Sequence, residues 1–169
     1  VSDEGNYEKI IKLYEEKDAD TPLFLFNVTM QNHSSYSDWA DYDNFSPDIT
    51  VEGSDSKLLP AYLSLIRLSD SAIQNLVSYF EAQEEPTMIV FFGDHQPADS
   101  VVRPVWKLNG KDDANLTDEE EALRYKVPFF IWANFDTEAE SDLEISANYL
   151  AAKTLDAAGL PKSAYATFL

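Results

Sequence analysis

Apolar residues recur at the three- and four-residue spacing of an amphipathic helix in several stretches of the chain. The clearest are residues 6–16, 58–81 and 145–158. The first ends before Pro22, a residue type that interrupts helices. A shorter helix is expected to begin at Thr117, whose hydroxyl suits a helix cap and which precedes a run of acidic residues.

Three apolar runs lack this spacing, at residues 23–28, 88–92 and 127–133. Short continuous apolar runs are typical of strands buried on both faces. Because these runs alternate with predicted helices, the sequence predicts an α/β fold, with a mostly parallel sheet flanked by helices on both faces. Residues 37–56 and 97–126 are largely polar, and we expect loops or mixed structure there.

The run 88–92 ends in Gly93, Asp94 and His95. An acid and an imidazole would therefore lie together at the carboxyl end of a strand, where α/β sheets gather ligands. Asp and His are also common ligands of divalent cations. The second histidine, His33, follows the run 23–28, so parallel strands would bring both histidines to one edge. A loop histidine and a turn-capping aspartate are the structural alternative.

Other candidate residues favour structural roles. Thr29 is a nucleophile by residue type, but no basic residue lies near it in the sequence, which favours a strand-end role. Asp70 lies within the helical stretch 58–81 and reads as an exposed or packing carboxylate. An aromatic-rich segment could either stack on a sugar or pack as a lid over the sheet, and the sequence leaves both open. Its members are Tyr36, Trp39, Tyr42 and Phe45.

The charge of the chain restricts its partners. Among 169 residues, 31 are acidic and 12 basic, giving a formal net charge of −19. Such a chain should repel nucleic acid and anionic lipid surfaces, so a phosphate-bearing substrate would need a local cation. No cysteine is present, which excludes disulfides and thiolate ligands. No stretch has the length of a membrane helix. The chain begins at Val1 without a methionine, and we expect it to be a piece of a longer protein.

Several segments, in this order, resemble the carboxyl half of the catalytic domain of lipoteichoic acid synthase-type phosphoglycerol transferases. These enzymes form part of the sulfatase-like branch of the alkaline phosphatase superfamily. Gly-Asp-His alone is a weak signal, whereas the ordered set is specific, and residues 1–169 would form the carboxyl-terminal part of one catalytic domain. The matching segments are Phe24 to His33, Tyr62 to Ile66 with Asp70, Thr87 to Pro97, Pro128 to Asn134, and residues 145–161.

The resemblance implies an enzyme for lipoteichoic acid biosynthesis, anchored in the cell membrane by upstream helices, with its catalytic domain at the extracellular face. It would move phosphoglycerol from phosphatidylglycerol to a glycolipid or a polyglycerolphosphate chain through a threonine nucleophile. One divalent cation, usually Mn²⁺, with Mg²⁺ or Zn²⁺ as alternatives, would activate that nucleophile. By the same resemblance, Asp94 and His95 would be metal ligands, and His33 would contact the phosphoglycerol group of the substrate.

The chain departs from the family because the nucleophile and the early acidic ligand would both lie upstream of it. Thr29 does not match the nucleophile motif, so we expect two metal ligands, no nucleophile and no activity in the chain alone. A sulfatase, a phosphodiesterase and a noncatalytic module on the same scaffold are the alternatives. A phosphoethanolamine transferase is disfavoured, because those enzymes often carry disulfides and further histidine ligands.

Overall fold

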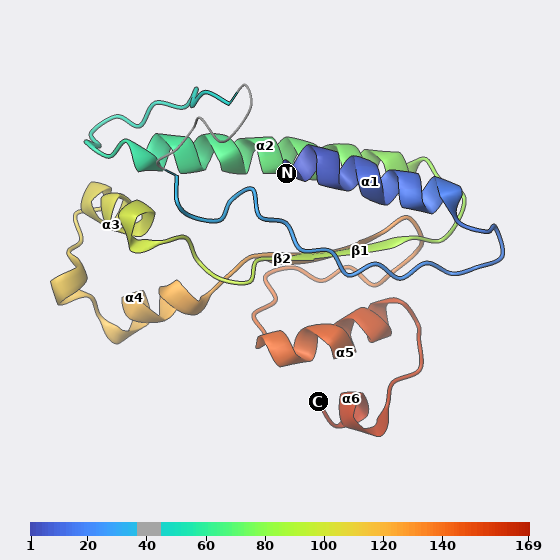
Figure 1. Ribbon diagram of the computed structural model, residues 1–169. Helices are drawn as coiled ribbons and strands as arrows, with labels where there is room; N and C mark the ends of the chain where they lie inside the picture. The colour runs from blue at the N-terminus through green and yellow to red at the C-terminus, as the bar shows by residue number, and fades with distance from the viewer. Residues whose placement is uncertain (37–44) are drawn as a thin grey trace. The chain divides into compact units, whose positions relative to one another are not determined.

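The computed structural model describes residues 1–36 and 45–169, which form two compact units (Figure 1). The first unit contains Val1–Leu76 and His95–Lys126, and the second contains Val77–Asp94 and Val127–Leu169. The elements in chain order are α1 (Asp3–Glu16), α2 (Leu58–Glu81), β1 (Met88–Phe92), α3 (Asp99–Leu108), the 3₁₀ helix η2 (Asp113–Asn115), α4 (Asp118–Ala122), the 3₁₀ helix η3 (Leu123–Tyr125), β2 (Phe129–Ala133), α5 (Ala147–Ala157) and α6 (Ala164–Phe168).

The core of the first unit forms where α2 meets α3 and the chain around Tyr36. Leu59, Leu65 and Val101 are almost fully buried there, so apolar positions from segments distant in sequence share one cluster. Helix α1 begins beside the middle of α2 (Figure 1), where the Ser69 hydroxyl donates to the Asp3 carboxylate, and Ser2 caps the first turn of α1 by accepting a hydrogen bond from the Gly5 N–H. None of the helices in the described ranges has the length and hydropathy needed to cross a membrane.

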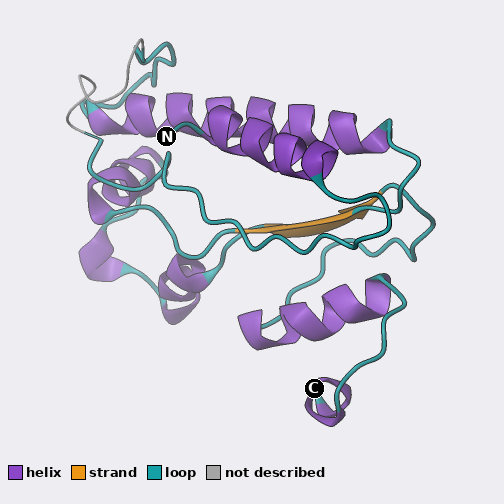
Figure 2. Cartoon of the chain, turned by 45° about the vertical axis from the view of Figure 1, so that its right-hand side comes forward, coloured by secondary structure: helices purple, strands orange, loops and turns teal. Residues whose placement is uncertain are grey.

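The chain is α/β, as its sequence predicts, but its strands pair differently. In the second unit β1 and β2 lie side by side in an antiparallel pair, with Met88 opposite Ala133 and Phe92 opposite Phe129 (Figure 2). Phe91 and Phe130 are paired across the strands, with their rings stacked at 5.2 Å between centroids. The described residues contain this one sheet, so the expected mostly parallel arrangement is not found within them.

The predicted strand at residues 23–28 is also absent. This segment runs without regular secondary structure, and its apolar side chains are exposed, with Phe24 at 89% and Phe26 at 73%. A strand requires a neighbour for its main-chain N–H and C=O groups. In the part of the chain that the structure describes, β1 and β2 pair with each other, and neither pairs with residues 23–28.

The four predicted helices are confirmed. Helix α2 has the predicted limits, α1 starts earlier than its apolar pattern indicated, and α5 is slightly shorter than predicted. Thr117 caps α4 as expected, in a reciprocal capping box with Glu120. Helix α3 was not predicted, because it is short, its apolar pattern is brief and it contains Pro104.

Candidate functional site

His33 occupies the last position of a tight turn that follows residues 23–28. Its main-chain N–H donates to the Met30 carbonyl at 3.1 Å, which closes the turn. The side chain is exposed, and its Nδ1 lies 2.6 Å from the carbonyl oxygen of Ser34. Because a carbonyl can only accept, Nδ1 carries the proton of the neutral ring, and Nε2 is the acceptor nitrogen.

His95 and Asp94 directly follow β1 and are exposed. The Gly93 N–H donates to the Pro128 carbonyl at 3.0 Å, so main-chain hydrogen bonding continues up to the residue before Asp94. The Nδ1 atom of His95 lies 2.8 Å from the Gln96 carbonyl oxygen. His95 therefore has the same tautomer as His33, with Nε2 as the acceptor nitrogen.

The structure brings the two histidine rings together within the first unit. Their centroids lie 6.1 Å apart and the ring planes meet at 80°, an edge-to-face arrangement. Residues 23–28 form no strand, so the convergence of His33 and His95 does not depend on the predicted parallel sheet. Asp94 precedes His95 in the chain and is grouped with the second unit.

Two side chains hold the loop that begins at His95. The Arg124 guanidinium donates to the Pro97 carbonyl at 3.2 Å and to the Asp99 carboxylate at 2.8 Å. The Gln96 side chain donates to the main-chain carbonyl of Lys126. These contacts connect the segment after His95 to the end of η3, and they fix the chain on the carboxyl side of the histidine.

The donor types at residues 94 and 95 fit a divalent cation, since carboxylate and neutral imidazole are both common ligands. Among residues 1–36 and 45–169, however, no three His, Cys, Asp or Glu side chains are arranged to hold a metal ion. The chemistry of Asp94 and His95 therefore fits a cation, while their number fits only part of a coordination shell. Their role as ligands, and that of His33 as a substrate contact, stays a prediction.

The remaining candidates have structural surroundings. Tyr36 is 2% exposed, belongs to the apolar core and donates from its hydroxyl to the Asn32 carbonyl. Phe45 packs against the same core, so for these two residues packing, not sugar stacking, is the better interpretation. Trp39 and Tyr42 lie outside the described residues. Asp70 is exposed on α2, as expected for a solvated carboxylate.

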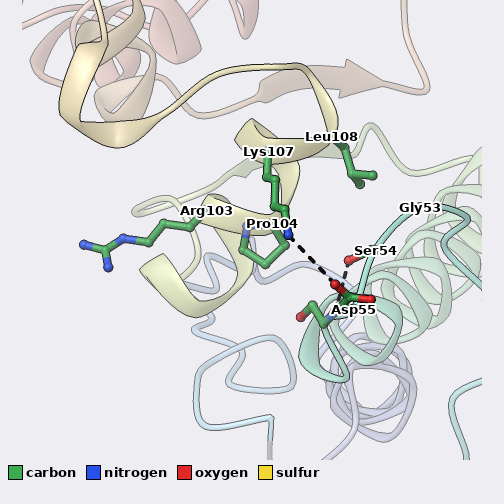
Figure 3. Close-up of a pocket in the computed structure, with 8 residues that line it drawn as sticks. Gly53, Ser54, Asp55, Arg103, Pro104, Lys107 and Leu108 are labelled. Atoms are coloured by element: carbon green, nitrogen blue, oxygen red, sulfur yellow. Dashed lines mark hydrogen bonds and ion pairs between the residues drawn. The ribbon is translucent and has the colours of Figure 1, made fainter.

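A shallow pocket of about 370 Å³ lies in the first unit between α3 and the segment before α2 (Figure 3). Lys107 points toward Asp55, with 3.9 Å between the ammonium nitrogen and the carboxylate, and Arg103 contacts Asp113 at 2.9 Å. Both cations already have carboxylate partners, so the pocket offers little attraction to a phosphate. Neither histidine lines it.

The polar residues that surround the histidine segments were not among the predicted site residues. Arg124 had no recognisable motif, because its partners lie more than twenty residues away. Ser69 did carry a signal, since it lies on the buried face of α2 in register with Leu65 and Leu76. A hydroxyl on an apolar helical face requires a hydrogen-bond partner, and that requirement could have identified it.

Comparisons with known proteins agree with part of this reading. The family model described as Sulfatase matches residues 1–160. The chain is 27% identical over 176 aligned residues to a protein of Rhizobium meliloti (strain 1021) named "Putative cyclic beta-1,2-glucan modification protein". That alignment covers 100% of this chain and 27% of the relative's length. No solved structure matches the chain.

Proposed function

The chain belongs to the sulfatase family, and on that basis we propose that it forms part of an enzyme that transfers phosphoglycerol from a phosphatidylglycerol-type lipid. Membership confirms the sulfatase-like, alkaline phosphatase superfamily part of the predicted resemblance. Membership of the lipoteichoic acid synthase branch goes further than the family match, and we keep it as the source of the proposed donor.

One observation carries the proposal. His33 and His95 lie with ring centroids 6.1 Å apart, and in each ring Nδ1 faces the carbonyl of the following residue. Histidines that bind metals commonly donate their second ring N–H to such an acceptor, which fixes the tautomer and the ring orientation. The same tautomer prepares Nε2 of His95 to bind a cation and Nε2 of His33 to accept a hydrogen bond.

We assign the cation to Asp94 and His95, completed by ligands from the rest of the parent protein. Sulfatase-family domains typically use a divalent metal, and Mn²⁺ is our proposal for this one, with Mg²⁺ and Zn²⁺ as alternatives. When bound, such an ion supplies positive charge that activates a nucleophile and stabilises a phosphoryl group. The carboxylate of Asp94 contributes the negative charge that holds the ion in place.

We assign His33 to the phosphoglycerol group. In its neutral form Nε2 accepts a hydrogen bond, which suits a glycerol hydroxyl, whereas a protonated ring would donate to a phosphoryl oxygen. In either form His33 orients the group that is transferred. During transfer the phosphorus–oxygen bond to diacylglycerol breaks and a bond to the acceptor hydroxyl forms, while diacylglycerol takes up the proton.

We propose two classes of acceptor hydroxyl. The resemblance points to a glycolipid or a growing polyglycerolphosphate chain. The name of the Rhizobium relative refers to modification of a cyclic glucan, which makes a glucan hydroxyl the second acceptor class. We place the parent protein at the extracellular face of a bacterial membrane. The net charge of −19 makes nucleic acid an unsuitable partner.

The test is Mn²⁺-dependent formation of diacylglycerol from phosphatidylglycerol dispersed in neutral detergent micelles, by the complete catalytic domain of the parent protein. We expect turnover that EDTA abolishes and that Asp94→Asn lowers by about ten-fold or more. Asp70→Asn is the matched control, because it removes one exposed carboxylate from α2. When the glycerol of phosphatidylglycerol is radiolabelled and a glycolipid or a cyclic glucan is supplied in parallel reactions, the compound that becomes labelled identifies the acceptor.

Parallel assays with an aryl sulfate and with a phosphodiester test the alternative of a sulfatase or a phosphodiesterase. If the folded, metal-binding wild type leaves phosphatidylglycerol intact but cleaves one of these substrates, the proposed reaction is wrong and the alternative replaces it. Failure to bind metal at all would favour a noncatalytic module.

A further inference from the structure

A buried polar network lies beneath the His33 turn in the first unit. Asp3 is 2% exposed, Gln31 4% and Ser69 8%, so the network is almost fully removed from solvent. The Asp3 main-chain N–H donates to Gln31 Oε1 at 2.9 Å, and Gln31 Nε2 donates to the Leu65 carbonyl at 3.1 Å. The network therefore connects the start of α1, the turn and the middle of α2.

The Ser69 hydroxyl is the centre of this network. It donates to the Asp3 carboxylate, and it accepts from Gln31 Nε2 at 3.0 Å and from Asn32 Nδ2 at 2.7 Å. A hydroxyl has one donor and two acceptor positions, so all three are used. Asp3 determines which way the hydroxyl points, and Ser69 can then receive both amide groups.

The two side-chain amides that donate to Ser69 belong to Gln31 and Asn32, the central residues of the turn that ends at His33. The turn closes through the bond from the His33 N–H to the Met30 carbonyl. The Gln31 and Asn32 side chains point to Ser69 from within that turn, so the buried network fixes its main chain. His33 is thus an exposed ring on a turn that is anchored from below.

Stability alone accounts poorly for this arrangement. Among the described residues, Asp3 Oδ1 and Asn32 Oδ1 are buried without a hydrogen-bond partner. Burial of a carboxylate is costly unless it is fully hydrogen-bonded or paired with a cation, and a partly satisfied network offers less stability than an apolar contact. The network is therefore better explained by what it holds in place.

We propose that Ser69, oriented by Asp3, is a positioning residue for His33. The hydroxyl holds the turn through Gln31 and Asn32, and the turn sets where the His33 ring meets its ligand. The inference rests on the substrate-binding role proposed for His33, and it adds residues that contact neither substrate nor metal. Rigid support of this kind limits the displacement of a binding group, and small displacements are costly in an active site.

The direct test is NMR of the His33 and His95 rings in the complete catalytic domain of the parent protein. His33→Gln and His95→Gln variants assign the two sets of ring signals. We expect Ser69→Ala to shift or broaden the His33 signals more than those of His95. Asn32→Ala, which removes one of the two bonds from the turn, should produce a smaller change in the same direction.

Ser64→Ala is the matched control. Ser64 is another buried serine of α2, and its hydroxyl likewise donates to one carbonyl and accepts from two N–H groups, at Pro60, Asp48 and Ile49. Its loss should lower the stability of the unit without moving the His33 signals.

Unchanged His33 signals in both Ser69→Ala and Asn32→Ala, or equal changes in Ser64→Ala, would overturn the proposal.

Kinetics of the complete catalytic domain give the second readout. Ser69→Ala should raise KM for the lipid donor by roughly five-fold with little change in kcat, the loss expected for about one net hydrogen bond in ground-state binding. If the domain shows no turnover of phosphatidylglycerol, the proposed function fails, yet the NMR comparison still decides whether Ser69 positions His33. If turnover is normal and KM is unchanged, the positioning role is refuted while the proposed function stands.

Discussion

At the residue scale, main-chain carbonyls give His33 and His95 the same tautomer, although we propose different roles for them: His95 as a metal ligand and His33 as a substrate contact. Each ring faces the carbonyl of the residue that follows it, at 2.6 Å for His33 and 2.8 Å for His95. Nε2 is the acceptor nitrogen in both rings. Their surroundings differ in the chain that leads into them: a turn for His33 and the end of β1 for His95.

The two histidines should therefore respond differently to substitution in the complete catalytic domain. His95→Ala should weaken Mn²⁺ binding by about ten-fold or more, because a ligand is removed. His33→Ala should leave Mn²⁺ binding near the wild-type value and raise KM for the phosphoglycerol donor. Calorimetric titration with Mn²⁺ and steady-state kinetics measure the two effects. Equal losses of metal affinity in both variants would contradict the division of roles.

Tyr7 should make the stability of the folded chain depend on pH in the alkaline range. Burial, together with the nearby Asp3 carboxylate, raises the pKa of Tyr7 from 10.0 to about 12. Because the folded state favours the protonated phenol, its contribution to stability is complete below pH 10.0 and is lost as the pH rises toward about 12. Between these values the wild type should lose stability more steeply than Tyr7→Phe.

Urea unfolding at a series of alkaline pH values tests this expectation. The exposed Tyr165→Phe serves as the control, since it removes a phenol from the surface without changing the surroundings of Tyr7. Parallel stability curves for wild type and Tyr7→Phe across this range would show that burial of Tyr7 does not influence its ionisation.

At the element scale, Asn134 connects the end of β2 to the chain between α2 and β1. Its side-chain nitrogen lies within 3.1 Å of the carbonyls of Phe80, Gln83 and Glu85, and its Oδ1 accepts from the Thr87 N–H at 2.7 Å. The side chain therefore ties the end of α2 and the connection that follows it to the residue just before β1.

Asn134→Ala should lower the free energy of unfolding by about 2 kcal/mol, because it removes the side-chain hydrogen bonds to four main-chain groups. Asn148→Ala, at an exposed position of α5, is the control and should change it little. Urea unfolding followed by circular dichroism measures both variants. Equal midpoints for the two would contradict the role assigned to Asn134.

The contacts of Arg124 should stabilise the loop that carries His95. The guanidinium bonds to Pro97 and Asp99, and it lies 5.8 Å from the centre of the Trp106 ring. Arg124→Gln should weaken Mn²⁺ binding to the complete catalytic domain several-fold by loosening this loop. Arg103→Gln, which breaks the ion pairs of Arg103 with Asp99 and Asp113 but leaves the Arg124 contacts in place, should not. Equal affinities for Arg124→Gln and wild type would show that the loop does not depend on Arg124.

Sequence patterns predicted the elements whose partners are local or follow simple periodicity. The stretch 58–81 and the run 88–92 have their predicted limits in α2 and β1. The run 23–28 has the composition of a strand but no strand beside it in the described residues, and composition alone cannot supply a partner. The antiparallel pairing of β1 and β2 and the short helix α3 likewise depend on tertiary contacts that no local pattern encodes.

The same limit applies to the candidate site. His33, Asp94 and His95 could be selected from residue type, position after apolar runs and resemblance to a known family. Ser69 could not be joined to His33 in this way, because their connection runs through side chains of separate segments. Hydrogen bonds between segments distant in sequence become visible only in three dimensions.

At the scale of the whole molecule, charge is the dominant feature. A formal net charge of −19 on 169 residues implies self-repulsion in the folded state. Raising NaCl from about 0.01 M to about 0.15 M should therefore increase the thermal midpoint, because it shortens the range of this repulsion. Differential scanning calorimetry measures the change. A midpoint that falls with added salt would mean that attractive ion pairs outweigh the net repulsion.

The same negative charge would repel a phosphate substrate, and a bound cation would offset that repulsion. The most direct measurement is calorimetric titration of Mn²⁺ into the complete catalytic domain of the parent protein, comparing wild type, Asp94→Asn and Asp70→Asn. We predict that Asp94→Asn weakens binding by about ten-fold or more while Asp70→Asn binds like the wild type. Unaltered Mn²⁺ affinity in a folded Asp94→Asn domain would contradict the assignment of Asp94 and His95 as a metal site.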